Sequence, residues 1–321
     1  MKSDVSITFV AKKYGVSDQA VYNIFESYVC INRHHLTEVL CIDEFKNLKT
    51  EDGKFAAVLL DPMKSRILDI IENRRLEKLY DYFYQISLEE KESVKYFVTD
   101  MYEPYRSIKK NFFPNAIHIV DHFHFARYVY DAADNVRIRI MKEYPTSSIE
   151  YRLLKKYWHL FIKPIDEIQE FEQYNPFRKK KTLTSVIMSD YLNISDELQL
   201  AFDLKEFFVD IDKKAHYETR NQSIKQIIKL FKDSELDEFI TVANMFENWF
   251  EEIGNSYIRF GDKRLNNAYL EGKNNRIKEL KKISYGCDSF YYFRNRLMYV
   301  LNGDEPIGRV DTSKIPRTPR K

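Results

Sequence analysis

The order of hydrophobic patterns between residues 39 and 121 constrains the fold more than any other feature of the sequence. Short apolar runs bounded by turn residues are typical of strands, and a 3.6-residue period is typical of an amphipathic helix. By these criteria the chain forms three strands (39–45, 54–62 and 66–73), a helix (76–87), a strand (94–100), a helix (103–113) and a strand (116–121). Three antiparallel strands followed by two strands with helical crossovers form the ribonuclease-H-like plan, a mixed-sheet α/β fold, and we expect it here.

The first thirty residues have the pattern of a helix-turn-helix. Gly15 can adopt the left-handed conformation that ends a helix, and Ser17 is a suitable N-cap for the next one. The second helix would present Gln19 and Asn23 to the major groove of DNA. Any small helical packing unit shows a similar pattern, so a purely structural interpretation stays open.

Strand signals stop after Asp121, and the pattern becomes helical. Long charged segments of helical period fill residues 122–258, with the basic stretch RKKKT as a link, and two more helices are expected at 267–283 and 289–301. The expected domains are a helix-turn-helix segment (1–36), the first part of the sheet domain (37–125), an all-α insertion (126–258), the closing helices of the sheet domain (259–303) and a basic tail (304–321). We expect the tail to be disordered.

Composition excludes several classes of protein. No apolar run approaches the roughly 18–20 residues of a membrane span, and the N-terminus is too polar for a secretory signal. Cys30, Cys41 and Cys287 are scattered without the spacing of a disulfide framework or a zinc ribbon, so a cytoplasmic protein is expected. Residues 259–321 carry 15 Lys and Arg against 7 Asp and Glu, which favours contact with a polyanion, although a solvated charged face has the same composition.

Two carboxylates lie where neighbouring strands are expected. Asp43 belongs to the first strand and Asp100 ends the fourth, so both would open onto the same edge of the sheet if these strands are adjacent. Such carboxylates repel each other, and a divalent cation relieves the repulsion. Glu271 on a later helix is a candidate third carboxylate, whereas Glu44 would point to the opposite face of the strand. Taken singly, an Asp at a strand end usually caps a turn, and a lone helical Glu usually lies on the surface.

Three sequence blocks in the same order resemble the DDE transposases of bacterial insertion sequences, specifically the ISL-three type. They are CIDEFKN with GKFAAVLLDPMKSRILDIIENR, then VTDMYEPYRSIKKNFFPNAIHIVDHFHFARYV, then YLEGKNNRIKELKKISYGCDSFYYFRNRLMYVL. The resemblance implies that Asp43, Asp100 and Glu271 are the catalytic, metal-binding carboxylates. It also implies two Mg²⁺ or Mn²⁺ ions, water attack at the terminal phosphodiester of the element, and attack of the freed 3′ hydroxyl on target DNA.

The same resemblance assigns supporting roles. Asp121, His122 and His124 are expected beside the active site, although Asp121 in place of Asp100 as the second metal ligand stays open. A zinc site on the two histidines is not expected, because no further ligand is nearby. The polar side chains of the closing block are expected to bind DNA phosphates, namely Lys273, Asn274, Asn275, Arg276, Lys278, Lys281, Lys282, Arg294 and Arg296. Tyr285, Tyr291 and Tyr292 would stack on bases or lie in the core.

The partner implied is double-stranded DNA, at the element ends and at the target site. Joining two ends implies a homodimer or a larger assembly, located with the bacterial nucleoid and without a membrane. Longer members of the family carry a zinc-binding segment ahead of the helix-turn-helix, and this sequence is expected to lack it. Two alternatives remain: a truncated or inactive transposase-derived protein that only binds DNA, and a ribonuclease-H-like nuclease or resolvase that cuts without joining.

Overall fold

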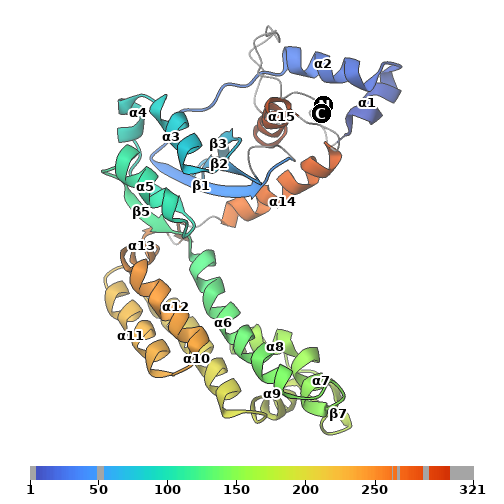
Figure 1. Cartoon of the computed structure of the whole chain (residues 1–321), viewed down its shortest axis with the longest axis vertical. Helices are drawn as coiled ribbons and strands as arrows, with labels where there is room; N and C mark the ends of the chain where they lie inside the picture. Colours follow the sequence, from blue (N-terminus) through green and yellow to red (C-terminus); the bar gives the residue numbers. More distant parts are fainter. Residues whose placement is uncertain (1–4, 49–53, 262, 266–267, 285–288, 304–321) are drawn as a thin grey trace. The chain divides into compact units, whose positions relative to one another are not determined.

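The structure is a computed structural model that describes residues 5–48, 54–261, 263–265, 268–284 and 289–303 (Figure 1). The chain divides into two compact units. Unit 1 combines residues 1–119 with 265–321, and unit 2 is the intervening stretch 120–264. None of the helices within the described ranges has the length and apolar character needed to span a bilayer.

A mixed five-stranded sheet forms the centre of unit 1. Its strands are β1 (Val39–Lys46), β2 (Phe55–Asp61), β3 (Arg66–Ile71), β4 (Tyr96–Thr99) and β5 (Ile117–Val120). They lie in the order β3-β2-β1-β4-β5. The first three strands are antiparallel neighbours, whereas β4 runs parallel to β1. The mixed α/β architecture predicted from the sequence is therefore confirmed, with each strand within a few residues of its predicted bounds.

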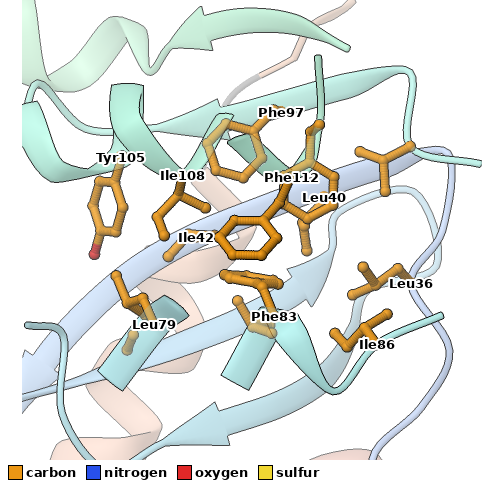
Figure 2. Packing of buried hydrophobic residues seen from close by; sticks show 14 of the residues in the cluster. Leu36, Leu40, Ile42, Leu79, Phe83, Ile86, Phe97, Tyr105, Ile108 and Phe112 are labelled. Carbon is orange, nitrogen blue, oxygen red and sulfur yellow. The ribbon is translucent and has the colours of Figure 1, made fainter. Parts of the chain in front are cut away.

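The helices between the strands cover one face of this sheet. They are α3 (Leu76–Tyr84), α4 (Leu88–Glu92) and α5 (Glu103–Phe112). Figure 2 shows aromatic and aliphatic side chains of α3, α5, β1 and β4 meeting in one buried cluster, which includes Phe83, Phe112, Leu40, Ile42 and Phe97. Complete burial of each such side chain stabilises the fold by about 1.5–3 kcal/mol. The short helix α4 was not expected from the sequence.

The N-terminal helices form the turn that the sequence indicated. They are α1 (Ile7–Tyr14) and α2 (Asp18–Tyr28). Gly15 ends α1 with a φ of 67°, a conformation that glycine adopts without steric cost, and the Ser17 side chain caps α2 by accepting the Ala20 N–H.

Two closing helices return to unit 1, α14 (Ala268–Ile283) and α15 (Phe290–Asn302), close to their predicted bounds. The α2 helix packs on α15, where the Tyr292 ring stacks on Tyr22 at 4.9 Å and touches Phe25 at 4.7 Å. Tyr292 is fully buried and therefore lies in the core, which was one of its two expected roles. It is not accessible for the other role, stacking on bases.

Unit 2 is mainly helical. Its helices are α6 (His122–Glu143), α7 (Ile149–Lys156), α8 (Trp158–Ile162), α9 (Thr184–Leu192), α10 (Asp196–Lys214), α11 (Arg220–Asp233), α12 (Asp237–Asn248) and α13 (Phe250–Asn255), with a short 3₁₀ turn at Ile165–Glu167. The expectation of an all-α insertion is wrong in one respect. The strands β6 (Glu172–Asn175) and β7 (Lys180–Leu183) form a hairpin inside the expected range 126–258. A second pair, β8 (Arg259–Phe260) and β9 (Lys263–Arg264), lies just beyond that range. These strands are short and polar, so their sequences lack an apolar alternation.

Candidate active site

Asp43 and Asp100 lie at matching positions on neighbouring strands. In the parallel register of β1 and β4, Leu40 pairs with Phe97 and Cys41 with Val98. Continuing that register by two residues sets Asp43 opposite Asp100, which follows directly after the last residue of β4. Side chains at the same level of adjacent strands point to the same face of a sheet. The two carboxylates predicted from the sequence are therefore neighbours.

The alternation of side chains tells which face carries Asp43. Leu40 and Ile42 belong to the cluster beneath α3 and α5, so the odd-numbered residues of β1 face the other side. Phe45, two residues after Asp43, meets Phe293 of α15 at a ring distance of 6.2 Å. The α15 helix lies on this side, where Asn302 also exchanges hydrogen bonds with the backbone of Ile67 in β3. Asp43 is 9% exposed and accepts the backbone N–H of Glu44 at 2.7 Å.

The end of β4 is fixed by a buried pair of polar side chains. The Thr99 hydroxyl donates to the carbonyl of Asp100 at 2.8 Å, and Thr99 Oγ1 lies 2.8 Å from His118 Nε2 of β5. Because the hydroxyl proton is directed to Asp100, its oxygen accepts from an Nε2–H tautomer of His118. Thr99 and His118 are both buried. Sequence reasoning did not single out His118, although a histidine between apolar strand residues was the available signal.

Glu44 faces away from Asp43 and is neutralised by a cation. Its carboxylate forms an ion pair with Arg74, whose guanidinium lies 4.5 Å from the Phe55 ring and 4.6 Å from the Tyr102 ring. Burial lowers the pKa of Arg74, but the bond to Glu44 and the charge of Glu44, with smaller contributions from Tyr102 and Tyr105, together outweigh burial, and the net pKa lies above the ordinary value for arginine. Glu44 is therefore engaged in an ion pair of its own on the opposite face.

The pKa of Tyr105 responds to the negative charges of the carboxylates near this edge of the sheet. Its side chain is fully buried, and its hydroxyl has no hydrogen-bond partner among the described residues. Burial raises the pKa of Tyr105 well above its ordinary value, and the charges of Asp100, Glu44 and Asp43 raise it further. Tyr105 lies with Leu40 and Ile42 on the face covered by α3 and α5, so its hydroxyl is not part of the Asp43 face. The donor set itself fits a metal, because two neighbouring carboxylates suit a hard divalent cation such as Mg²⁺ or Mn²⁺.

The backbone at Glu271 belongs to α14, but its side chain lies outside the described part of the structure, as do those of Lys273 and Asn274. The end of this helix is tied to the end of β1, because Lys281 Nζ donates to the carbonyls of Lys46 at 2.8 Å and Asn47 at 2.5 Å. Burial lowers the pKa of Lys281, and the charge of Lys46 lowers it further. Within the described side chains, no group of three His, Cys, Asp or Glu is placed to hold a metal.

The Asp121-His122-Phe123-His124 segment begins α6 in unit 2. Asp121 is the N-cap residue and is buried, and His124 Nε2 lies 3.8 Å from its carboxylate. His122 Nε2 lies 2.8 Å from Asp212 Oδ2 of α10. The Asp212 carboxylate also accepts from Tyr257 and Arg264, both at 2.9 Å.

The ion pairs within unit 2 control the charge of Asp212. Burial raises its pKa, but the His122 bond and the charges of His122 and Arg264 outweigh burial and lower the pKa to about 2. His122 thus has a partner inside unit 2, and its expected contact with DNA stays a prediction.

The expected DNA-binding residues fall into two groups. Gln19, Asn23, Asn275, Lys278 and Lys282 are exposed, with Gln19 donating to Asn23 across one turn of α2. Arg276 pairs with Glu279 on the surface of α14.

The two arginines of α15 have a different role from the one expected. Arg294 donates to Asp69 at 2.6 Å and to the Ile31 carbonyl, whereas Arg296 is fully buried and donates to the Val5 carbonyl and to Ser284. Both guanidinium groups are occupied within unit 1.

Comparison with known proteins adds one finding to this geometry. A family model for transposases of the ISL-three DDE type matches residues 40–297, which is most of the chain. Searches of curated proteins and of solved structures gave no match. The matched range includes both aspartates, the whole of α14 and the first part of α15, up to residue 297. The chain belongs to the ISL-three family of transposases.

Proposed function

We propose that the protein is a DDE transposase that cleaves DNA at the ends of an insertion sequence and transfers the cut ends to target DNA. The observation that most supports this proposal is the register of β1 and β4, which, when continued by two residues, sets Asp43 opposite Asp100 on one face. Membership of the transposase family supports a reaction at phosphodiesters. The order β3-β2-β1-β4-β5, with helical connections before β4 and β5, supports the ribonuclease-H-like interpretation of unit 1.

Glu271 is the proposed third carboxylate. Lys281 ties α14 to the end of β1, and position 271 lies ten residues earlier, about 15 Å along a helix that rises ~1.5 Å per residue. Asp43 lies three residues before Lys46, about 10 Å back along the strand. Lengths of this size are compatible with a shared site, so the docking of α14 supports the assignment.

Asp43, Asp100 and Glu271 would hold Mg²⁺ or Mn²⁺, with two ions proposed. Such ions, when bound, activate water and stabilise the leaving oxygen of a phosphodiester. The residues of this chain keep the ligands in position: the bond between Thr99 and His118 fixes the backbone at Asp100, and the Glu44 amide orients Asp43. Arg74 neutralises Glu44 and so limits the negative charge at this edge.

DNA would be held by residues outside the carboxylate group. We propose that Lys278, Lys282 and Asn275 bind phosphates and that Gln19 and Asn23 of α2 contact the element ends. All five are exposed. Asp121 and His124 are proposed as supporting residues of the active site. A homodimer or larger assembly is proposed because two ends must be joined.

The test is cleavage and joining of labelled duplexes that carry the ends of the encoding element, with Mg²⁺ present. Asp43→Asn and Asp100→Asn should each lower the cleavage rate about 10³-fold or more, because each removes a charged ligand. Asp81→Asn, an exposed residue of α3, removes the same charge and is the matched control. If Asp121→Asn abolishes cleavage and Asp100→Asn does not, Asp121 is the second ligand. A wild-type protein that binds the ends but never cuts them contradicts the proposed function.

A further inference from the structure

The β6–β7 hairpin of unit 2 carries an exposed basic tip. Tyr174 pairs with Lys181 and Asn175 with Lys180 in its antiparallel register. The connecting residues include Lys179, which adopts a positive φ of 53°. Sequence reasoning treated this stretch as a link between helices, because its cations gave no sign of a strand.

The tip is held in one shape by buried polar contacts. Asn175 is fully buried, and its side-chain oxygen accepts the backbone N–H groups of Phe177 and Arg178. Its amide donates to Asp190 of α9 at 2.7 Å, and Arg178 donates twice to the same carboxylate, at 2.7 and 2.8 Å. The Arg178 bond lowers the pKa of Asp190, so the carboxylate stays charged at neutral pH. The hairpin is therefore anchored to the body of unit 2.

The side chains beyond this anchor point outward. Lys179, Lys180 and Lys181 are all exposed, and none of them forms an ion pair or side-chain hydrogen bond with a described residue. Phe177 at the tip is 47% exposed and Tyr174 is 50% exposed. The nearest acidic residue of the hairpin, Glu172, lies at its other end opposite Leu183.

This arrangement raises the free energy of the folded hairpin, and no described contact of the three lysines offsets the increase. Three adjacent like charges repel one another, and the neighbouring cation, Arg178, is held by Asp190 and fixes the turn. Exposed aromatic side chains beside the lysines add apolar surface that water solvates poorly. A polyanion that lies across the tip would offset the repulsion and cover this surface.

We propose that the tip of the β6–β7 hairpin binds the phosphate backbone of duplex DNA. The proposal rests on the proposed function only in taking DNA as the partner. Lysines that reach phosphates contribute affinity with little base information, and each neutralised phosphate of B-DNA adds about 0.9 to the steepness of the salt dependence. The contact would therefore be independent of sequence and would position DNA along unit 2.

The experiment compares two double variants of the full chain. Lys180→Gln/Lys181→Gln removes two cations from β7 and leaves Lys179 of the connecting turn unchanged. Lys225→Gln/Lys229→Gln removes two exposed cations from α11 of the same unit and is the matched control. Binding of a short fluorescein-labelled duplex of arbitrary sequence is measured by anisotropy in EDTA over a range of salt concentrations.

The hairpin variant should bind the duplex about tenfold or more weakly at ~0.15 M salt, with a salt dependence less steep by about 2, whereas the α11 variant should match the wild type. Equal effects of the two variants overturn the inference. Thermal melting within about 2 °C of the wild type shows that both variants fold. A wild-type protein that fails to bind any duplex contradicts the proposed function itself, whereas unchanged binding of the hairpin variant contradicts this inference alone.

Discussion

Two basic regions of the protein use their charges in opposite ways. The closing segment of unit 1 has the sequence character of a DNA-binding surface, yet Arg294, Arg296 and Lys281 donate to groups within the unit. The β6–β7 hairpin of unit 2 has the sequence character of a linker, yet Lys180 and Lys181 are exposed. A run of cations in a sequence therefore does not tell which of them a partner can reach.

Periodicity explains the difference. The buried stripe of α15 includes Tyr292, Phe293, Arg296 and Leu297, and Arg296 falls on it because it follows Tyr292 by four residues. In the hairpin, Lys181 lies opposite the exposed Tyr174, on the outward side of a two-stranded ribbon. The geometry of the element, rather than the density of charge, decides whether a cation serves the fold or the surface.

The largest expected effect follows from removing an internal cation. Arg294→Ala should lower the free energy of unfolding by about 4 kcal/mol, because it leaves the buried Asp69 without its cation. Urea unfolding followed by far-UV circular dichroism measures the loss. Lys282→Ala, an exposed residue of α14, should change stability by less than about 0.5 kcal/mol. If the two variants are equally stable, the distinction between internal and surface cations fails.

Acid provides a second test of the internal ion pairs, through the carboxylate Asp212 that pairs with His122 and Arg264. Asp212 has an ordinary pKa of 3.8 and a pKa of about 2 in the folded protein, so its contribution to stability is complete above the ordinary value. That contribution, about 2 kcal/mol, should disappear as the pH falls from about 4 to about 2, because the unfolded state then binds the proton first.

Tryptophan fluorescence follows this transition selectively, because Trp158 and Trp249, the two tryptophans of the chain, both lie in unit 2. Asp212→Asn should be less stable at neutral pH and should lose less stability in this range than the wild type. A variant with the same pH profile as the wild type would show that the bonds of Asp212 to His122 and Arg264 contribute nothing.

The smallest expected effect on stability concerns the exposed lysines of α14. Lys278→Gln/Lys282→Gln should leave the melting temperature within about 2 °C of the wild type. The same change should make the salt dependence of duplex binding less steep by about 2, as phosphate contacts require. Binding that keeps its full salt dependence would restrict the DNA surface of unit 1 to the N-terminal helices.

Local features of the fold were predictable from the sequence. Gly15 and Ser17 mark the turn between α1 and α2 because backbone conformation and capping depend on neighbouring residues alone. The strands of the sheet were recognisable because buried strands need runs of apolar residues. The β6–β7 hairpin was missed because Asn175 and Asp190, which hold its turn, act through a contact between separate elements.

The candidate site was predictable in part for the same reason. Asp43 and Asp100 stood out because each lies at an expected strand, and the observed register brings them together. The pair of His122 with Asp212 joins residues 90 positions apart, and no local pattern announces it. The bond between Thr99 and His118 likewise depends on which strands become neighbours.

The closing of α15 on the N-terminal segment has a consequence for synthesis on the ribosome. Asn295 accepts the backbone N–H of Ile31 across 264 positions of the chain, and Arg296 reaches the carbonyl of Val5 across 291. The packing of α2 on Tyr292 of α15 can form only after α15 has been translated. In a nascent chain these contacts are therefore absent until α15 has left the ribosome, and a helix made late completes the docking of helices made early.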